Sequence, residues 1–308
     1  MLASGPLHRT FATIDRFAPP QAKALRAELD ARFADPRKAS ADRFVWDYWH
    51  VPGQYTALRT PAWTYFSAAQ YQRFHRRLVE WGRQNLGCHD VSPPWLSVYV
   101  EGCRQELHGD LPHGPFAFVF SLTRWQGRPF TGGETLIVRD EVLDFWHSFT
   151  SIRSVEEPDL LRSIEPRFGR LTVFDPRLPH GVREVRGTHD PRLGRAVIHG
   201  WFVQPRPFYT GPLRGAEVEA HLAELGPFIQ RLTAALPLAG LVSFRLDITA
   251  AGQVRAATVL ADTTRVPAHQ EAARRRALLA LRRHLATWRF SRRARPSQLT
   301  LPLVFEAG

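Results

Sequence analysis

The middle of the chain consists of short apolar runs separated by glycine and proline residues, and this pattern limits the possible folds more than any other feature. One run, Phe116–Phe120, is apolar throughout, as expected of a strand that is covered on both faces. Many short strands joined by such turns are typical of a β-sandwich or a jelly-roll barrel. The runs that predict strands are 96–100, 116–120, 134–138, 170–174, 181–185 and 196–202.

Helices are expected ahead of these strands. A short strand at 11–14 precedes a helical pattern that continues to about residue 35, and Pro19 and Pro20 lie in its first turn, where proline is tolerated. A second helix is predicted over 68–86. We therefore expect a mainly β domain with flanking helices.

Two segments show no regular period. The aromatic-rich stretch between the two helices, 44–66, is predicted to be a long ordered loop. It is expected either to pack between helix and sheet or to line a substrate cleft. A polar insertion at 140–166 interrupts the strands and is predicted to be partly helical.

A second, small α+β domain is predicted after a proline-rich linker at 204–212. Helical and alternating patterns beyond the linker are sufficient for a separate core. We place the first domain at 1–207 and the second at 213–308. The second domain is predicted to contain helices at 216–236 and 269–287 and strands at 242–248, 254–260 and 299–305.

The net charge of +12 comes almost entirely from arginine, because Lys23 and Lys38 are the only lysines. This skew reflects base composition better than selected phosphate contacts, and most of the arginines are dispersed. The short arginine clusters near the C-terminus are explained equally well by a solvated helix face. We therefore do not expect a nucleic-acid partner.

The cysteine content indicates a reducing compartment, since Cys88 and Cys103 are too few for a disulfide framework. Residues 1–15 lack the apolar core of a signal peptide, and no apolar stretch is long enough to cross a bilayer. The sequence thus predicts a cytoplasmic protein without a membrane partner.

Two histidines and an aspartate form the candidate metal site. One residue separates His108 from Asp110, so a strand would direct both side chains to the same side. His180 follows in the segment Phe174–His180. Two imidazoles and one carboxylate on one face of a metal suit non-haem Fe(II), because dioxygen and a co-substrate need free coordination positions. We predict these three residues as metal ligands and catalytic residues.

Simpler interpretations exist for all of these residues. The H-x-D pair could form an ordinary surface turn, and His180 could be a loop histidine. His113, His147 and His199 are expected to be core or loop residues, although His113 could touch a substrate. Gly132 and Gly133 are most simply turn formers.

The order of the motifs from about residue 8 to 206 resembles that of the Fe(II)/2-oxoglutarate-dependent oxygenases, most closely the prolyl 4-hydroxylase-like branch. The resemblance implies a double-stranded β-helix, which is the cupin-like jelly roll. Its motifs are Tyr99–Gly102, His108 with Asp110, Gly132–Thr135, Ile164–Leu171, His180, and Arg195 followed by Gly200–Phe202.

The resemblance implies a role for each matching residue. His108, Asp110 and His180 would bind Fe(II). Arg195 would hold the distal carboxylate of 2-oxoglutarate, and a guanidinium group is the best bidentate partner for a carboxylate. Tyr99 matches a tyrosine that hydrogen-bonds the co-substrate. Thr172 would point its hydroxyl into the same pocket.

The sequence departs from the family pattern at several positions. The gap between His180 and Arg195 is longer than usual, so Arg192 is an alternative anchor for the carboxylate. Ser121 stands where the prolyl hydroxylases often have a tyrosine. Asp110 is intact, which argues against the halogenases, in which a small residue vacates a ligand position.

The function implied is a 2-oxoglutarate-dependent dioxygenase that hydroxylates an unactivated C–H bond and releases succinate and CO2. A peptidyl or amino-acid substrate is favoured, and ascorbate is a further expected reductant. The alternatives are hydroxylation of a small natural-product intermediate and a non-catalytic binding protein on the same barrel.

The C-terminal domain resembles the C-terminal domain of TonB-type energy transducers. The resemblance rests on 241–248, the turn at Gly252, Trp288–Phe290 and 299–305. It implies partner binding through an exposed sheet edge, a general way to hold an extended peptide. Either a docking module for a partner or substrate or a stabilising accessory domain is expected.

Overall fold

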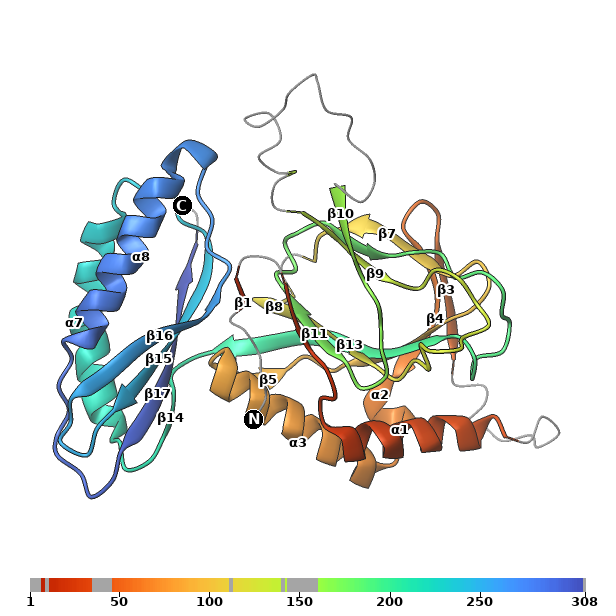
Figure 1. Ribbon diagram of the computed structural model, residues 1–308, viewed down its shortest axis with the longest axis horizontal. Coiled ribbons are helices and arrows are strands. Elements are labelled where there is room, and N and C mark those ends of the chain that lie inside the picture. The colour runs from red at the N-terminus through yellow and green to blue at the C-terminus, as the bar shows by residue number, and fades with distance from the viewer. Residues whose placement is uncertain are drawn as a thin grey trace. The chain divides into compact units, whose positions relative to one another are not determined.

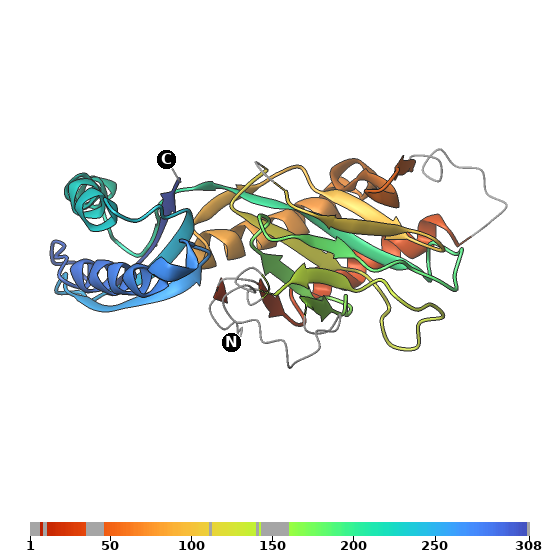
Figure 2. The same cartoon turned by 90° about the horizontal axis from the view of Figure 1, so that it is seen from above.

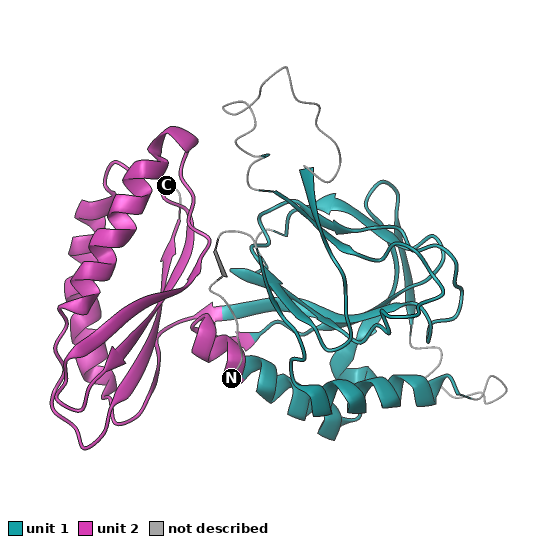
Figure 3. Ribbon diagram, viewed as in Figure 1, with its two compact units in different colours: residues 1–4, 10–79, 91–203 teal, residues 5–9, 80–90, 204–308 magenta. Residues whose placement is uncertain are grey.

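The computed structural model describes residues 7–8, 11–34, 46–110, 113–139, 142 and 160–306. The chain divides into two compact units, each formed by separate stretches of sequence (Figure 3). Unit 1 comprises residues 1–4, 10–79 and 91–203, and unit 2 comprises residues 5–9, 80–90 and 204–308. The sequence predicts two contiguous domains, 1–207 and 213–308, instead. That each of these two segments folds as a unit stays a prediction.

The first unit is built on a strongly curled antiparallel sheet (Figures 1 and 2). Its strand order is β10-β9-β12-β7-β4-β6-β13-β8-β11-β2, and β3 pairs with β4 at its side. The sheet curls so that β7, β9 and β12 face β6, β8 and β13 across a common interior, which is the jelly-roll arrangement predicted from the short strands. The twelve strands of this sheet are β2 (Phe11–Ile14), β3 (Asp47–Val51), β4 (Tyr55–Pro61), β5 (Cys88–Val91), β6 (Trp95–Tyr99), β7 (Arg104–His108), β8 (Phe116–Ser121), β9 (Thr135–Val138), β10 (Leu161–Ile164), β11 (Leu171–Phe174), β12 (His180–Val182) and β13 (Arg195–Pro205).

The predicted helices before the barrel are present as α1 (Pro19–Arg32) and α3 (Ala68–Asn85), with a single-turn helix α2 (Ala62–Tyr65) between them. Both proline residues of α1 lie at its first two positions, where the helix has no use for their missing N–H groups. Phe120 of β8 packs against Phe74 of α3, with ring centroids 4.7 Å apart, and against Phe17. These contacts hold the helices against the outside of the sheet.

The prediction of a long ordered loop over 44–66 is wrong for the part that the structure describes. Residues from Asp47 onward form the hairpin β3–β4 and then α2, and β4 also pairs with β6 and β7. A turn containing Gly53 at φ 71° joins the two strands. Tryptophan and tyrosine have a high propensity for strands, and pairing of β4 with β6 makes this segment a strand although its sequence shows no regular alternation.

Most of the predicted polar insertion at 140–166 lies outside the described residues. Its last part forms β10, which pairs with β9, rather than a helix. His147 and Phe44 also lie outside the described residues.

The second unit has a five-stranded sheet in the order β1-β16-β15-β17-β14. Two helices, α7 and α8, cover one face of it (Figure 1). Its core includes Phe244, Leu281, Leu285, Leu299 and Leu301, all essentially inaccessible to solvent. The elements are β1 (Leu7–His8), β14 (Phe208–Thr210), α7 (Gly215–Thr233), β15 (Gly240–Ile248), β16 (Val254–Asp262), the 3-10 turn η2 (Ala268–Gln270), α8 (Glu271–Ala286) and β17 (Ser297–Phe305).

The small α+β unit agrees with the predicted class and nearly every predicted element, but the predicted linker at 204–212 does not exist as such. β13 continues to Pro205, and Phe208–Thr210 form β14, which pairs with β17. Pro205 is the last residue of β13, and Pro207 and Pro212 lie outside β14, so none of them removes an N–H donor from the interior of a strand. The resemblance to TonB domains stays a prediction.

Both cysteines are buried and unbonded. No helix among the described residues is long and apolar enough to cross a membrane. The cytoplasmic location stays a prediction from the sequence.

We predict that Gly132→Ala strongly destabilises unit 1, because a Cβ atom there would lie 1.8 Å from the carbonyl oxygen of Glu184, at φ +74°. Gly127 is the matched control, since it also has a positive φ, +67°, but has open space around its Cα. Gly127→Ala should cost only the ~1–2 kcal/mol of a left-handed residue. Differential scanning calorimetry measures both effects, and equal losses of Tm in the two variants would contradict the clash.

Candidate metal centre and co-substrate pocket

The two histidines of the H-x-D…H set are brought together by strand pairing. His108 is the last residue of β7 and His180 the first of β12, and the two residues pair directly across the antiparallel ladder. Their ring centroids lie 4.4 Å apart. Gly181 permits this approach, because a Cβ atom there would lie 2.5 Å from the carbonyl oxygen of Gln105.

Asp110 completes the cluster from the loop that follows β7. The expectation that a strand carries both His108 and Asp110 is wrong, since β7 ends at His108. The backbone N–H of Asp110 donates to the carbonyl oxygen of Pro176 at 2.9 Å, which ties the loop to the segment before His180. The Asp110 carboxylate oxygens lie 3.2 Å from the Nε2 atoms of His108 and His180. One ligand atom from each residue lies within 4.8 Å of the other two.

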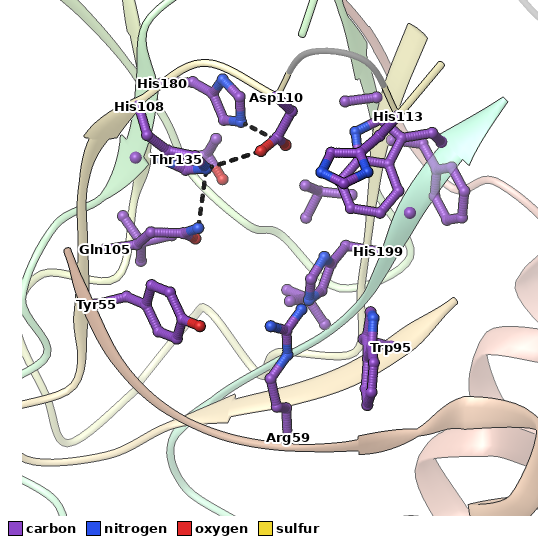
Figure 4. A pocket seen from close by; sticks show the side chains of 18 of the residues that line it. Tyr55, Arg59, Trp95, Gln105, His108, Asp110, His113, Thr135, His180 and His199 are labelled. Atoms are coloured by element: carbon purple, nitrogen blue, oxygen red, sulfur yellow. Dashed lines mark hydrogen bonds and ion pairs between the residues drawn. The ribbon is translucent and has the colours of Figure 1, made fainter. Parts of the chain in front are cut away.

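The tautomers of both histidines are set by the backbone. Nδ1 of His108 lies 2.9 Å from the carbonyl oxygen of Glu106, and Nδ1 of His180 lies 2.9 Å from that of Leu178. A carbonyl oxygen only accepts, so each Nδ1 donates its proton, and each Nε2 lies against Asp110, where it donates to the carboxylate when the ring is protonated and has a free lone pair for a metal when the ring is neutral. Outer hydrogen bonds of this kind orient metal-binding imidazoles. The three side chains therefore present a preformed metal site (Figure 4).

The electrostatics of the cluster favour an ionised aspartate. Burial opposes the charge, but hydrogen bonds from His108 and His180 outweigh it and hold the pKa of Asp110 well below its usual range. Burial also disfavours the charged form of His108, yet the hydrogen bond to Asp110 raises the pKa of His108 overall. A carboxylate that is ionised at neutral pH is the form that binds a divalent cation.

The cluster opens into a cavity of about 560 Å³ inside the barrel. Residues of β4, β6, β8 and β13 form the wall opposite the metal cluster, and most of the lining residues of β13 are two positions apart because such side chains share a face of the sheet. On β13 these residues are Arg195, Val197, His199 and Trp201.

Arg195 lies at one end of this wall and is only 1% exposed. Its Nη2 donates to the Thr135 hydroxyl at 3.1 Å, and its guanidinium carbon lies 4.6 Å from the centre of the Tyr99 ring. Nε and Nη1 are buried and have no hydrogen-bond partner among the described residues. Two unsatisfied donors on a buried guanidinium are the complement of a carboxylate, so the site fits the distal end of 2-oxoglutarate.

Arg192, the alternative anchor, does not line the cavity. Its side chain is 42% exposed and forms an ion pair with Asp190 at 2.7 Å. The loop between His180 and Arg195 folds back through a backbone pairing of Thr131 with Arg186. The longer gap in the sequence is thus accommodated outside the pocket.

The remaining predicted residues divide between the pocket and the core. Tyr99 lines the cavity and donates to Gln105 Oε1 at 3.4 Å, and burial raises the pKa of its phenol. Thr172 is buried but is not among the residues that line the cavity, and Thr135 supplies the hydroxyl beside Arg195 instead. Ser121 donates to the carbonyl oxygen of Pro166 and also lies outside the cavity lining.

Sequence reasoning assigned no role in the pocket to four polar residues that line it. Gln105 Nε2 lies 3.0 Å from His108 Nε2, and the Thr135 hydroxyl accepts a hydrogen bond from Arg195. His199 is a satisfied histidine, as expected, with the Ser97 hydroxyl at 2.8 Å from its Nε2, and it also lines the cavity wall. Arg59 projects from β4 into the same space (Figure 4). The alternation Tyr55, Ala57, Arg59 was the available signal for the last of these.

His113 is exposed, lines the cavity and packs against Trp201, with ring centroids 4.5 Å apart and the rings tilted by 30°. This position agrees with the suggestion that His113 could touch a substrate. It contributes no atom to the metal cluster.

Residues 94–203, which contain all three cluster residues and Arg195, match the model of the 2OG-Fe(II) oxygenase superfamily. The resemblance drawn from the motifs is therefore confirmed for this part of the chain, and Fe(II) and 2-oxoglutarate are the cofactor and co-substrate that define the family. No curated protein sequence matches the chain.

Solved structures of related shape include a prolyl-4-hydroxylase from Pseudomonas putida, with 17% identity over 64% of this chain and 93% of that chain and a TM-score of 0.46. HygX from Streptomyces hygroscopicus, solved with nickel, 2-oxoglutarate and hygromycin B, has 17% identity over 62% of this chain and 82% of that chain and a TM-score of 0.40. The 2-oxoglutarate-dependent epimerase SnoN of nogalamycin biosynthesis has 13% identity over 62% and 76% and a TM-score of 0.40.

We predict that His108→Ala abolishes the binding of divalent metal, measured with Mn(II) by electron paramagnetic resonance. The loss should exceed the ~10–100-fold effect of removing a residue that only supports a ligand. His113→Ala, which removes a nearby imidazole outside the cluster, should bind Mn(II) like the unmodified protein. Retained binding in His108→Ala would exclude this histidine as a ligand.

A second prediction concerns acid stability. Burial, together with the charges of Arg59 and Arg195, lowers the pKa of His199 to about 3. The unfolded chain binds a proton near the ordinary pKa of about 6.5, whereas the folded chain does not. Stability from this residue is therefore complete above pH ~6.5 and is lost as the pH falls toward 3. His199→Gln should flatten the decline of the unfolding free energy by up to ~1.4 kcal/mol per pH unit.

Urea unfolding between pH 4 and pH 6, at about half-unit steps, measures this slope. His50→Gln is the control for loss of a histidine as such, because His50 is an exposed residue of β3. Identical slopes in His199→Gln and the unmodified protein would show that His199 is not held neutral.

Proposed function

We propose that the protein is a 2-oxoglutarate-dependent dioxygenase that hydroxylates an unactivated C–H bond of a peptidyl or amino-acid substrate, with release of succinate and CO2. The observation that carries the proposal is the buried guanidinium of Arg195, with two unsatisfied donors, in the same cavity as the His108–Asp110–His180 cluster. A protein that only bound metal would have no reason to bury such a charge.

His108, Asp110 and His180 would hold the iron through two Nε2 atoms and a carboxylate, leaving its other positions for 2-oxoglutarate and dioxygen. Bound iron would activate dioxygen, which is the oxidant: one oxygen atom would enter succinate as 2-oxoglutarate loses CO2, and the other would enter the substrate. Arg195 and Thr135 would bind the distal carboxylate, and Tyr99 would cover the co-substrate from the side.

The barrel interior contributes by excluding water around the co-substrate. Val197, Val119 and Phe174 line the cavity between its polar groups, so a bound co-substrate would be enclosed by apolar side chains. A dry, shaped pocket limits side reactions of an oxidant when the substrate is absent. Ascorbate remains the expected reductant, which would return the iron to Fe(II) after a reaction cycle without substrate.

A non-catalytic binding protein on the same barrel is the second candidate. It would make the C-terminal unit the working part, as a docking module for a partner or substrate. An intact metal cluster beside a buried, unsatisfied arginine favours the enzyme. Hydroxylation of a small natural-product intermediate is the alternative within the enzyme class.

The proposal predicts that Fe(II) and 2-oxoglutarate, added without oxygen, produce the weak visible charge-transfer band of a chelated co-substrate. Addition of oxygen should then yield succinate. Absence of both the band and succinate would leave only the binding-protein alternative.

We further predict that Arg195→Gln weakens 2-oxoglutarate binding about 30-fold or more, equivalent to ~2 kcal/mol, because a buried charge-assisted pair is lost. Metal binding should be retained, since Arg195 is not part of the cluster. Arg192→Gln is the matched control and should leave the 2-oxoglutarate affinity unchanged. Calorimetric titration of Mn(II)-loaded variants measures both, and the reverse pattern would assign the anchor to Arg192.

A further inference from the structure

The cavity contains a second guanidinium group that the binding of metal and co-substrate does not use. Arg59 lies on β4, opposite Ser97 of β6, and shares the cavity wall with Tyr55, Trp95 and His199. Figure 4 shows its side chain reaching toward His199 and the space below the metal cluster.

Two indole rings hold the Arg59 side chain. Its guanidinium carbon lies 5.1 Å from the centre of the Trp49 ring and 4.6 Å from that of Trp95, and the two rings pack edge to face at 6.1 Å. Cation–π contacts at these distances fix the position of an arginine without neutralising its charge. The group is thus preorganised within the pocket.

Arg59 forms no ion pair with a carboxylate among the residues that the structure describes. Its Nε is buried and has no hydrogen-bond partner there. Two arginines with buried side chains, by contrast, have carboxylate partners: Arg26 pairs with Asp30 and Arg274 with Asp262, each at 2.8 Å. Partial burial lowers the pKa of Arg59, and the attraction of the Tyr99 and Tyr55 phenols and of Asp110 opposes this effect.

A charged group without an ionic partner in a partly enclosed pocket loses hydration free energy, and a ligand of opposite charge can offset this loss. Arg195 is positioned for the co-substrate by Thr135, and it pairs with Tyr99 at the end of the wall. Arg59 lies next to Ser97, farther along β6, where the rings of Trp49 and Trp95 and the phenol of Tyr55 surround it. The two arginines therefore suit two different ligands.

We propose that Arg59 binds a carboxylate of the primary substrate, with the rings of Trp95 and Tyr55 in the cavity wall beside the carbon skeleton of that substrate. The inference rests on the proposed function, in which 2-oxoglutarate occupies Arg195. It narrows the substrate class to organic acids, including amino acids and peptides with a carboxylate near the oxidised carbon, and disfavours cationic compounds.

The test measures binding rather than turnover. Protein loaded with Zn(II) and saturating 2-oxoglutarate is titrated with phenylacetate and, separately, with phenylacetamide, using saturation-transfer NMR of the probe. Phenylacetate should bind about tenfold more tightly than the amide, as expected of one charge-assisted hydrogen bond. Arg59→Gln should remove this preference without changing the 2-oxoglutarate affinity.

Two further variants control for folding and for charge alone. Arg59→Lys keeps the charge and should retain part of the preference, whereas Arg192→Gln removes an exposed arginine and should retain all of it. Equal binding of acid and amide to the unmodified protein would overturn the proposal, as would an unchanged preference in Arg59→Gln.

The remaining outcomes separate this inference from the proposed function. A loss of 2-oxoglutarate affinity in Arg59→Gln would assign Arg59 to the co-substrate and overturn the inference. Failure of the unmodified protein to bind Zn(II) and 2-oxoglutarate would overturn the proposed function, while an acid preference that depends on Arg59 would still support the anion site. If inorganic phosphate displaced phenylacetate at lower concentrations than phenylacetate itself needs for binding, Arg59 would be assigned to a phosphate ester of the substrate. That result would overturn the assignment to a carboxylate.

Discussion

The direct pairing of His108 with His180 is the constraint on which the site depends. It places the last residue of one strand against the first residue of another, far apart in sequence, and so fixes two imidazoles 4.4 Å apart before any metal arrives. Backbone carbonyl oxygens then fix both tautomers, and Asp110 needs only a short loop to reach both Nε2 atoms. Because the sheet orders both histidines and a backbone hydrogen bond ties down the loop of Asp110, little conformational entropy would remain to be lost if a metal bound there.

Strand alternation and strand pairing also place the residues of the opposite wall of the barrel. Alternation along β13 places Arg195, His199 and Trp201 on one face, and pairing with β6 and β4 adds Tyr99, Trp95 and Arg59. Burial and the positive charges of Arg59 and Arg195 lower the pKa of His199, which lines the same wall, so its imidazole is neutral. The cavity is therefore electropositive on the wall that faces the carboxylate of the metal cluster, as a pocket for anionic ligands should be.

Motif order in the sequence was sufficient to predict the family model that residues 94–203 match, because His108, Asp110, His180 and Arg195 are spaced along the chain in a recognisable way. Pocket residues without a motif could not be found in this way. Thr172 and Thr135 are both strand threonines, and only the curl of the sheet decides that Thr135 reaches Arg195. Arg59 was hidden in a segment interpreted as a loop, since the strand character of that segment depends on pairing with β6.

By itself, the sequence determined the barrel class, the two α-helices before it, the α+β pattern at the C-terminus and the three residues able to hold a metal. Local period and residue chemistry contain that information. Only the tertiary structure decided that Arg195 rather than Arg192 faces the cavity, that segments 5–9 and 80–90 join the second unit, and that a second arginine shares the pocket. These outcomes depend on strand register and on burial, which are set by contacts between residues distant in sequence.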